Sequence, residues 1–375
     1  MSLKHEFVTL ARTPGANIRE LCRRYGISPP TAYQLLERHA REGDAGLLER
    51  SRRPHNSPNR TPAALEQAVV DLREEHPAWG GRTLREVLLR SYNPVPSPGT
   101  ITAILRRNGC TVGGKRPQRD WQRFEHPHPN DLWQMDFKGH FPTSAGRCHP
   151  LTVLDDHSRF ALGLRACANE RTETVQEELS AIFRTYGLPV RMLMDNGPPW
   201  GHDADHPRTP LTVWLMRLGI QVSHGRPYHP QTQGKDERFH RTLKAEVLQG
   251  RHFVDLPSCQ AAFDWWRPVY NFERPHQALD MATPLSRYTP SPRSFPETLP
   301  PIEYGDGDLV RKVMAEGWVS FKGYAFKVGR ALRGYPVALR PTEDDGIWGV
   351  WFMTHPIADV DLRGPEPQVT RCPDV

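Results

Sequence analysis

The sequence HPQTQGKDE, residues 229–237, predicts a helix that begins near Gly234 and carries a carboxylate in its first turn. Beyond it, Phe239, Leu243 and Val247 recur every four residues, which is the spacing of an apolar stripe along one face of a helix. The pattern therefore predicts that one side of this helix packs against a core and that the other sides stay polar.

A charged face accompanies the stripe. Glu237, Arg241 and Lys244 are separated by four and three residues, so they share one face of the helix. Such a face could hold a metal ion through the carboxylate and a polyanion through the two cations. A solvated surface with the same charges is the competing interpretation.

Two further acids favour the first interpretation. Residues 132–137, LWQMDF, form a predicted strand, and the carboxylate of Asp136 in it would be costly to bury without a partner. Residues 190–194, VRMLM, form a second strand that ends at Asp195, where the ligands of α/β sheets gather. Three acids from separate segments suit a site with two Mg²⁺ ions, because ions roughly 3.5 to 4 Å apart repel one another unless a carboxylate lies between them.

Three motifs follow one another along the chain: WQMD at 133–136, DNG at 195–197 and PQTQGKDERFH at 230–240. RPHQAL at 274–279, with Thr283 and Pro284, comes after them. Each motif is common, but their order resembles the integrase core of bacterial insertion-sequence transposases and retroviral integrases, the DDE recombinases. The resemblance implies an α/β fold with a ribonuclease H-like catalytic core over residues 131–283.

The resemblance also implies a site. Asp136, Asp195 and Glu237 would be both the catalytic residues and the ligands of two Mg²⁺ ions, with Mn²⁺ as an alternative metal. One ion would activate water or a 3′-hydroxyl, and the other would stabilise the leaving oxygen of an in-line displacement. No covalent protein intermediate is required, whereas tyrosine and serine recombinases need a protein hydroxyl as nucleophile.

The implied function is that of a transposase. It would bind the terminal inverted repeats of its element, free their 3′-hydroxyls and join them to target DNA, as a homo-oligomer on double-stranded DNA. Two other classes stay open: a non-catalytic helix-turn-helix regulator, which has no need of three acids in this order, and a ribonuclease H-like nuclease, which has no need of two DNA-reading domains.

Other acids compete for the role of ligands. Asp195 and Glu237 are separated by 41 residues, a longer gap than such enzymes usually have, and the polar segment 201–208 accounts for it as a loop insertion. His202, Asp203, Asp205 and His206 in this segment could form a metal cluster, although so tight a run rarely converges on one ion. Asp155 and Asp156 are assigned to a turn between strands at 151–154 and 160–166.

Composition agrees with a cytoplasmic enzyme of several domains. The chain has 375 residues, a formal net charge of +6 and six scattered cysteines without a CxxC pair, which predicts reduced thiols. No apolar run has the length of a membrane span and no signal-peptide core is present, so we expect no membrane partner. Residues 1–130 hold 21 Lys and Arg against 13 Asp and Glu, and this excess of mostly Arg favours phosphate partners.

The first 55 residues predict a helix-turn-helix domain. Helices are expected at 17–25 and 29–42, joined by a turn at 26–28, with Gly43 as a stop. The face of the second helix that would read DNA lies opposite Ala32 and Leu36 and carries Thr31, Gln34, Arg38 and Arg41. A three-helix core with another purpose would have a similar pattern.

A second helix-turn-helix domain is predicted over 56–112, with helices at 61–75, 81–90 and 97–108. Residues 113–130 then read as a basic linker, in which Lys115 and Arg116 would contact DNA, although a solvated linker is nearly as consistent. Lys235 is a further candidate for DNA contact.

The rest of the chain completes the predicted organisation. A helix at 172–186 would cross over to the Asp195 strand, a Pro-rich linker spans 284–301, and a tail spans 364–375. Between them, 302–363 would form a small β-barrel with strands at 310–314, 318–321, 324–328, 336–339 and 347–353. Either DNA contact or subunit packing would suit this barrel.

Overall fold

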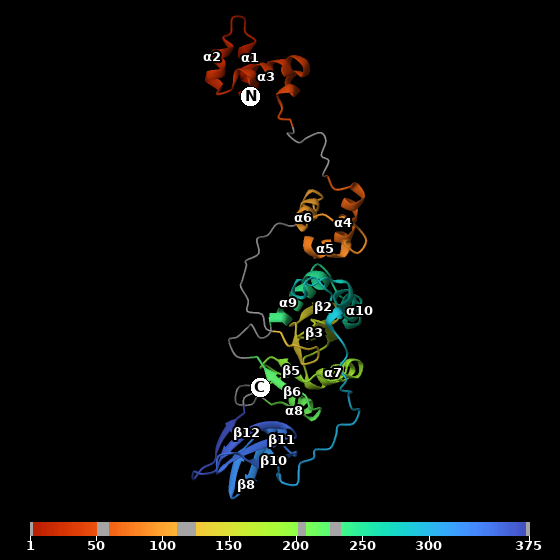
Figure 1. Cartoon of the computed structure of the whole chain (residues 1–375), viewed down its shortest axis with the longest axis vertical. Coiled ribbons are helices and arrows are strands. Elements are labelled where there is room, and N and C mark those ends of the chain that lie inside the picture. Colours follow the sequence, from red (N-terminus) through yellow and green to blue (C-terminus); the bar gives the residue numbers. More distant parts are fainter. Residues whose placement is uncertain (1–2, 51–59, 111–124, 202–207, 226–233, 373–375) are drawn as a thin grey trace. The chain divides into compact units, whose positions relative to one another are not determined.

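A computed structural model of the chain describes residues 3–50, 60–110, 125–201, 208–225 and 234–372 (Figure 1). It divides into two compact units, Met1–Thr61 and Pro62–Val375. Within the described residues, no helix has the length and apolar character needed to cross a membrane.

The first unit is a small bundle of helices. They are α1 (Leu3–Ala11), α2 (Ile18–Tyr25), α3 (Pro29–Glu42) and the 3₁₀ turn η1 (Gly43–Leu47). Ser28 begins α3 because its side chain accepts a hydrogen bond from the backbone N–H of Thr31 and the prolines that follow need no such bond. The predicted helix pair is confirmed, and α1 is an addition that the sequence analysis did not assign.

The packing side of α3 is rotated from the expected one. Ala32 and Leu35 are buried, whereas Leu36 is only partly buried. Leu35 takes the central position because it faces Phe7 and Cys22 in the same cluster, and a sequence pattern with two adjacent leucines does not distinguish them.

The second unit opens with three more helices. They are α4 (Ala63–Glu75), α5 (Gly81–Leu88) and α6 (Pro98–Arg107), packed around Val69, Trp79, Leu84, Ile101 and Ile104. Gly81 lets α5 approach α6 closely, since a Cβ there would lie 2.7 Å from the carbonyl oxygen of Pro98. The second predicted group of helices is confirmed, with α5 ending two residues earlier than expected.

A six-stranded mixed sheet follows. Its strands are β1 (Leu132–Phe137), β2 (Phe141–Thr143), β3 (Gly146–Asp155), β4 (Ala161–Cys167), β5 (Arg191–Met194) and β6 (Gln221–His224). The order is β2-β3-β1-β5-β6, and β4 pairs with β3. Strand β1 is antiparallel to β3 but parallel to β5, so it joins a hairpin to a pair of crossover strands.

Helices cover both faces of this sheet (Figure 1). One face packs against α7 (Thr172–Tyr186) and α8 (Pro210–Arg217), with Trp133 and Met135 of β1 in the cluster. The other face packs against α9 (Gly234–Leu243) and α10 (Leu256–Pro268), which continue into the π turns η3 (Lys244–Leu248) and η4 (Val269–Glu273). The expected α/β core and the apolar stripe of Phe239, Leu243 and Val247 are confirmed.

The Pro-rich segment is not a free spacer. Tyr288 is buried in the cluster on the α7 side of the sheet, and Phe295 packs against the same cluster. The Arg293 guanidinium donates hydrogen bonds to the carbonyl oxygens of Leu218 (3.1 Å) and Gly219 (2.8 Å). The segment predicted as an extended spacer therefore packs on the core, because the aromatic side chains between its prolines bury apolar surface there.

The chain ends in a β-rich domain. Five strands pair in the order β13-β12-β11-β10-β7, and a two-stranded sheet lies beside them. The elements are β7 (Leu309–Lys312), β8 (Trp318–Phe321), β9 (Tyr324–Lys327), β10 (Pro336–Pro341), β11 (Ile347–Phe352), β12 (His355–Asp361) and β13 (Gln368–Arg371). The predicted tail is wrong at β13, whose short polar sequence forms a strand because β12 offers it an edge.

Candidate functional site

Asp136 and Asp195 lie side by side at the ends of two parallel strands. Trp133 pairs with Met192 and Gln134 with Leu193, so the same register carried two residues further sets Asp136 opposite Asp195. Burial, with a smaller contribution from the negative charge of Asp195, raises the pKa of Asp136 to about 7. The structure therefore brings together two of the three predicted catalytic acids.

Glu237 lies on α9, which packs against β1. Its side chain is exposed, as are those of Arg241 and Lys244, so the expected charged face exists. In the described part of the chain, however, no three His, Cys, Asp or Glu side chains lie close enough together to hold a metal ion. Among the described residues, Glu237 therefore does not complete a group of three ligands with Asp136 and Asp195, and the preceding segment 226–233 lies outside the described residues.

Two residues that the sequence analysis missed face Asp136 from α9. The Nε2 atom of His240 lies 2.8 Å from the hydroxyl of Thr152, which itself donates to the carbonyl oxygen of Asp136 at 2.9 Å. The imidazole N–H must therefore be on Nε2, which leaves Nδ1 as a lone pair 3.9 Å from a carboxylate oxygen of Asp136. Burial lowers the pKa of His240 to about 4, so the ring is neutral near pH 7.

Asp236 is the second missed residue. Only 1% of its surface is exposed, and burial, followed by the charge of Asp136, raises its pKa well above the usual range. A signal was present in the sequence, because position 236 extends the apolar stripe backwards by three residues from Phe239. A carboxylate at a core position of a helix is costly unless it has a partner.

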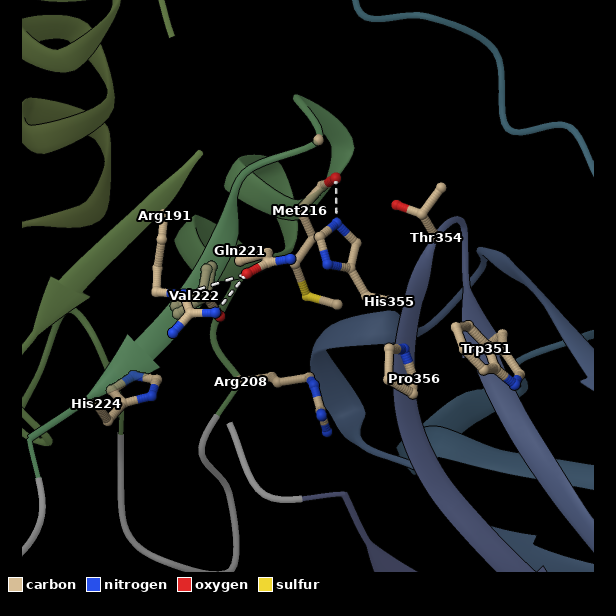
Figure 2. A pocket seen from close by; sticks show the side chains of 12 residues that line it. Arg191, Arg208, Met216, Gln221, Val222, His224, Trp351, Thr354, His355 and Pro356 are labelled. Atoms are coloured by element: carbon tan, nitrogen blue, oxygen red, sulfur yellow. Dashed lines mark hydrogen bonds between the residues drawn. The ribbon is translucent and has the colours of Figure 1, made fainter. Parts of the chain in front are cut away.

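A separate pocket of about 420 Å³ lies between the β5–β6 edge of the sheet and the β11–β12 region (Figure 2). The guanidinium of Arg191 there donates to the side-chain oxygen of Gln221 at 3.1 and 2.7 Å, and Arg208 donates to the carbonyl oxygen of Ile357 at 3.3 Å. None of its described lining residues is Asp or Glu. The pocket therefore does not offer the oxygen ligands that a Mg²⁺ site needs.

The hairpin acids behave as turn residues. The carboxylate of Asp155 accepts hydrogen bonds from the backbone N–H of Ser158 (2.7 Å) and of Asn130 (2.7 Å). Asp156 accepts from the backbone N–H of His126 (2.8 Å) and from the Gln134 amide (2.7 Å). Asp155 is the last residue of β3 and Asp156 the first of the turn, so their assignment to the hairpin is confirmed.

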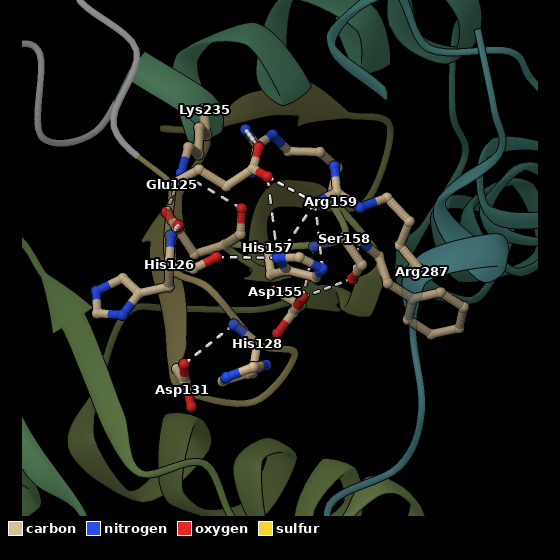
Figure 3. A network of polar contacts seen from close by, with 12 residues as sticks. Glu125, His126, His128, Asp131, Asp155, His157, Ser158, Arg159, Lys235 and Arg287 are labelled. Atoms are coloured by element: carbon tan, nitrogen blue, oxygen red, sulfur yellow. Dashed lines mark hydrogen bonds and ion pairs between the residues drawn. The ribbon is translucent and has the colours of Figure 1, made fainter. Parts of the chain in front are cut away.

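Lys235 belongs to the same network, not to an exposed DNA-binding face. Its ammonium pairs with the buried carboxylate of Asp156, and burial lowers the pKa of Lys235. Nearby, Glu125 accepts from Arg159 (2.9 Å) and Arg287 (2.7 Å), which joins both expected linkers to the β3–β4 turn (Figure 3). The prediction of DNA contact for Lys235 conflicts with this arrangement, because the cation is already committed to a buried carboxylate.

The predicted DNA-reading face of α3 is partly open. Thr31, Gln34 and Arg41 are exposed, although Arg41 also donates to Glu42 at 2.9 Å. Arg38 is partly buried and donates to the carbonyl oxygen of Leu48 at 2.9 Å, so it holds the chain that follows the helix. Lys115 and Arg116, together with the possible metal ligands His202, Asp203, Asp205 and His206, lie outside the described residues.

Five family matches cover most of the chain. Residues 126–230 and 218–284 each match an integrase core domain, and 308–368 match the C-terminal domain of the IS481 family of transposases. Residues 5–55 match a helix-turn-helix domain and 31–105 a homeodomain-like domain.

Individual relatives agree with these matches. The chain is 29% identical to the insertion element IS476 uncharacterized 39.2 kDa protein of Xanthomonas euvesicatoria, over 61% of this chain and 66% of that protein. It is 26% identical to the transposase for insertion sequence element IS904 of Lactococcus lactis, over 48% of this chain and 68% of that protein. Among solved structures, the catalytic core domain of BIV integrase aligns with 24% identity and a TM-score of 0.32, over 42% of this chain and 92% of that one.

Proposed function

Because the chain belongs to the insertion-sequence transposases that have an integrase core, we propose that it cleaves the ends of its own element and joins them to target DNA. The observation that carries the proposal is the parallel pairing of β1 with β5, which sets Asp136 beside Asp195. The negative charge of Asp195 raises the pKa of Asp136, and a divalent metal ion would relieve this repulsion.

The residues present fit such an ion. Carboxylate oxygens are the ligands that Mg²⁺ prefers, and it commonly uses one or two of them, with water and substrate phosphates in the remaining positions. We assign Asp136 and Asp195 to the metal ions and Glu237 to the second ion, with Mg²⁺ or Mn²⁺ as the metal. Bound metal would supply a more acidic water or 3′-hydroxyl and would stabilise charge on the leaving oxygen.

The chain's own side chains would position the reactants. Thr152 and His240 would hold the backbone of Asp136 in place, because His240 donates to the Thr152 hydroxyl and that hydroxyl donates to the carbonyl oxygen of Asp136. Arg241 and Lys244, exposed on α9, would hold the phosphates of the DNA end. With these side chains in positioning roles, the nucleophile that attacks phosphorus would be water or a DNA hydroxyl.

Recognition of the ends is assigned to the helical domains. Thr31 and Gln34 would lie nearest the bases, and Arg41 would contact phosphate, with Lys115 and Arg116 following the DNA beyond them. The partners are then the terminal inverted repeats, the target DNA and further copies of the chain, in the cytoplasm.

Labelled duplexes that carry the inverted repeats flanking the gene test the proposal. Purified protein with Mg²⁺ or Mn²⁺ should cleave at the 3′ ends and form strand-transfer products, and EDTA should stop both reactions. Specific binding without cleavage would instead support the regulator, and equal cleavage of unrelated duplexes would support the nuclease.

A further inference from the structure

Asp236 is a buried carboxylate that has no hydrogen-bonding partner among the described residues. Its side chain is 1% exposed, and within the described residues neither of its carboxylate oxygens has a donor. Asp155 and Asp156 are equally buried, yet both accept hydrogen bonds from backbone and side-chain groups. Leaving a buried acceptor unsatisfied is costly, so a native carboxylate in this state calls for a partner that is not among the described residues.

The position of Asp236 points to that partner. It lies in the first turn of α9, four residues before His240, so the two side chains share one face of the helix. His240 on this face approaches the carboxylate of Asp136 at 3.9 Å. Glu237 is rotated by about 100° from Asp236 and is exposed, so Asp236 is the acid of α9 that faces Asp136.

The cation that acts on Asp236 is already paired with another carboxylate. The charged groups that act on it are Asp136, Asp156 and Lys235. Lys235 is the cation among them, and its ammonium is paired with Asp156. Asp136 and Asp236 therefore repel one another across the β1–α9 contact, and Lys138, the cation that acts on Asp136, is not among the charged groups that act on Asp236.

We infer that Asp236 is a metal ligand, which together with Asp136 binds a divalent, oxygen-preferring cation such as Mg²⁺. The inference rests on the proposed function and deepens it, because it adds a fourth acid to Asp136, Asp195 and Glu237. A pair of carboxylates is sufficient for Mg²⁺ when water and phosphate fill the other positions. It therefore agrees with the absence, in the described residues, of a preformed group of three ligands.

Metal titrations that do not depend on catalysis test the inference. Binding of Mg²⁺ and Mn²⁺ is measured by calorimetry and by the shift in melting temperature, with and without an element-end duplex. Asp236→Asn should weaken binding by about tenfold or more and should raise the melting temperature of the metal-free protein, because the uncompensated carboxylate is gone. Asp264→Asn, an exposed acid on α10, is the matched control and should change neither quantity.

A cysteine variant separates direct ligation from a long-range effect of charge. Thiolate prefers soft metals, so Asp236→Cys should lose Mg²⁺ affinity but gain a tight Cd²⁺ site that neither the wild type nor Asp264→Cys has. Equal Cd²⁺ binding by the two cysteine variants would overturn the inference. So would Mg²⁺ affinity in Asp236→Asn equal to that of the wild type.

Metal binding by the wild type separates a failure of the proposed metal chemistry from a failure of the role of Asp236 alone. If it binds neither Mg²⁺ nor Mn²⁺ with or without DNA, the proposed metal chemistry fails and the role of Asp236 fails with it. If it binds metal and Asp136→Asn loses that binding while Asp236→Asn keeps it, the role of Asp236 fails alone.

Discussion

Buried acids lie at both ends of β1, but the described residues satisfy all of their carboxylate oxygens at one end and not at the other. At the start of the strand, Asp155 and Asp156 are fully buried, and backbone N–H groups, an amide and Lys235 satisfy their oxygens. At its other end, Asp136 faces Asp195 and Asp236. Asp236 has no donor within the described residues.

Burial alone therefore does not identify a functional acid. Burial raises the pKa of Asp155 as well as that of Asp136, and donors to Asp155 oppose the rise. What separates the two groups is whether the protein supplies its own hydrogen bonds and cations. Donors satisfy Asp155 and Asp156, whereas Asp236, beside Asp136, has no donor among the described residues, which indicates a place for an external cation.

The largest expected effect is on catalysis. Asp136→Asn, Asp195→Asn and Glu237→Gln should each lower strand cleavage by more than about a hundredfold, because each removes a charged ligand but no phosphate contact. Binding of element ends in a gel-shift assay should stay near wild type. A variant that keeps more than about one hundredth of the wild-type rate would remove its residue from the site.

Replacing the hydrogen-bonded acid Asp155 should lower the stability of the protein, whereas replacing Asp236, which has no donor among the described residues, should not. Asp155→Asn should destabilise the protein by about 2 kcal/mol or more, because its amide would face backbone donors that now bond to a carboxylate. Asp236→Asn should cause no loss. Chemical denaturation of both variants measures the difference, and equal destabilisation would contradict the comparison.

In metal-free protein, the contribution of Asp136 to stability should fall as pH rises. The pKa of Asp136 is raised from 3.8 to about 7 in the folded state, so its contribution is intact below pH 3.8 and is lost as pH rises towards 7. His240 and His276, whose pKa values burial lowers to about 4 and about 3, act in the opposite direction. The quantity to measure is therefore the stability of the wild type minus that of Asp136→Asn across this range.

That difference should fall from pH 4 to pH 7, and added Mg²⁺ should reduce the fall. A difference that does not change with pH would show that Asp136 does not titrate in this range.

The smallest effect on stability is expected for the open face of α9. Arg241→Ala with Lys244→Ala should change the free energy of unfolding by less than about 0.5 kcal/mol, because both side chains are exposed. Strand transfer should nevertheless fall, since the DNA end loses two cations. Arg251→Ala, also exposed, is the control, and wild-type strand transfer by the double variant would mark the pair as an ordinary solvated surface.

Much of the organisation could be predicted from local patterns. The start of α3 at Ser28 and its two prolines, the alternation of β3 and β4 around a turn, and the apolar stripe of α9 each depend on residues close together in the chain. Where two patterns were equivalent locally, as with Leu35 and Leu36, the prediction was displaced by one residue. The polar strand β13 and the packed Pro-rich segment had no local signal, because distant elements supply their partners.

Motif order and strand ends are properties of neighbouring residues, so the sequence was enough to predict an order of domains and to propose Asp136, Asp195 and Glu237 as the catalytic acids. Only the tertiary structure decided which acids and cations are already satisfied. Lys235 and Asp156 are 79 positions apart and meet through the contact of α9 with the sheet, and the same contact buries Asp236 without a donor. The pairing of a buried charge is set by what surrounds it in space, and a linear pattern does not contain that information.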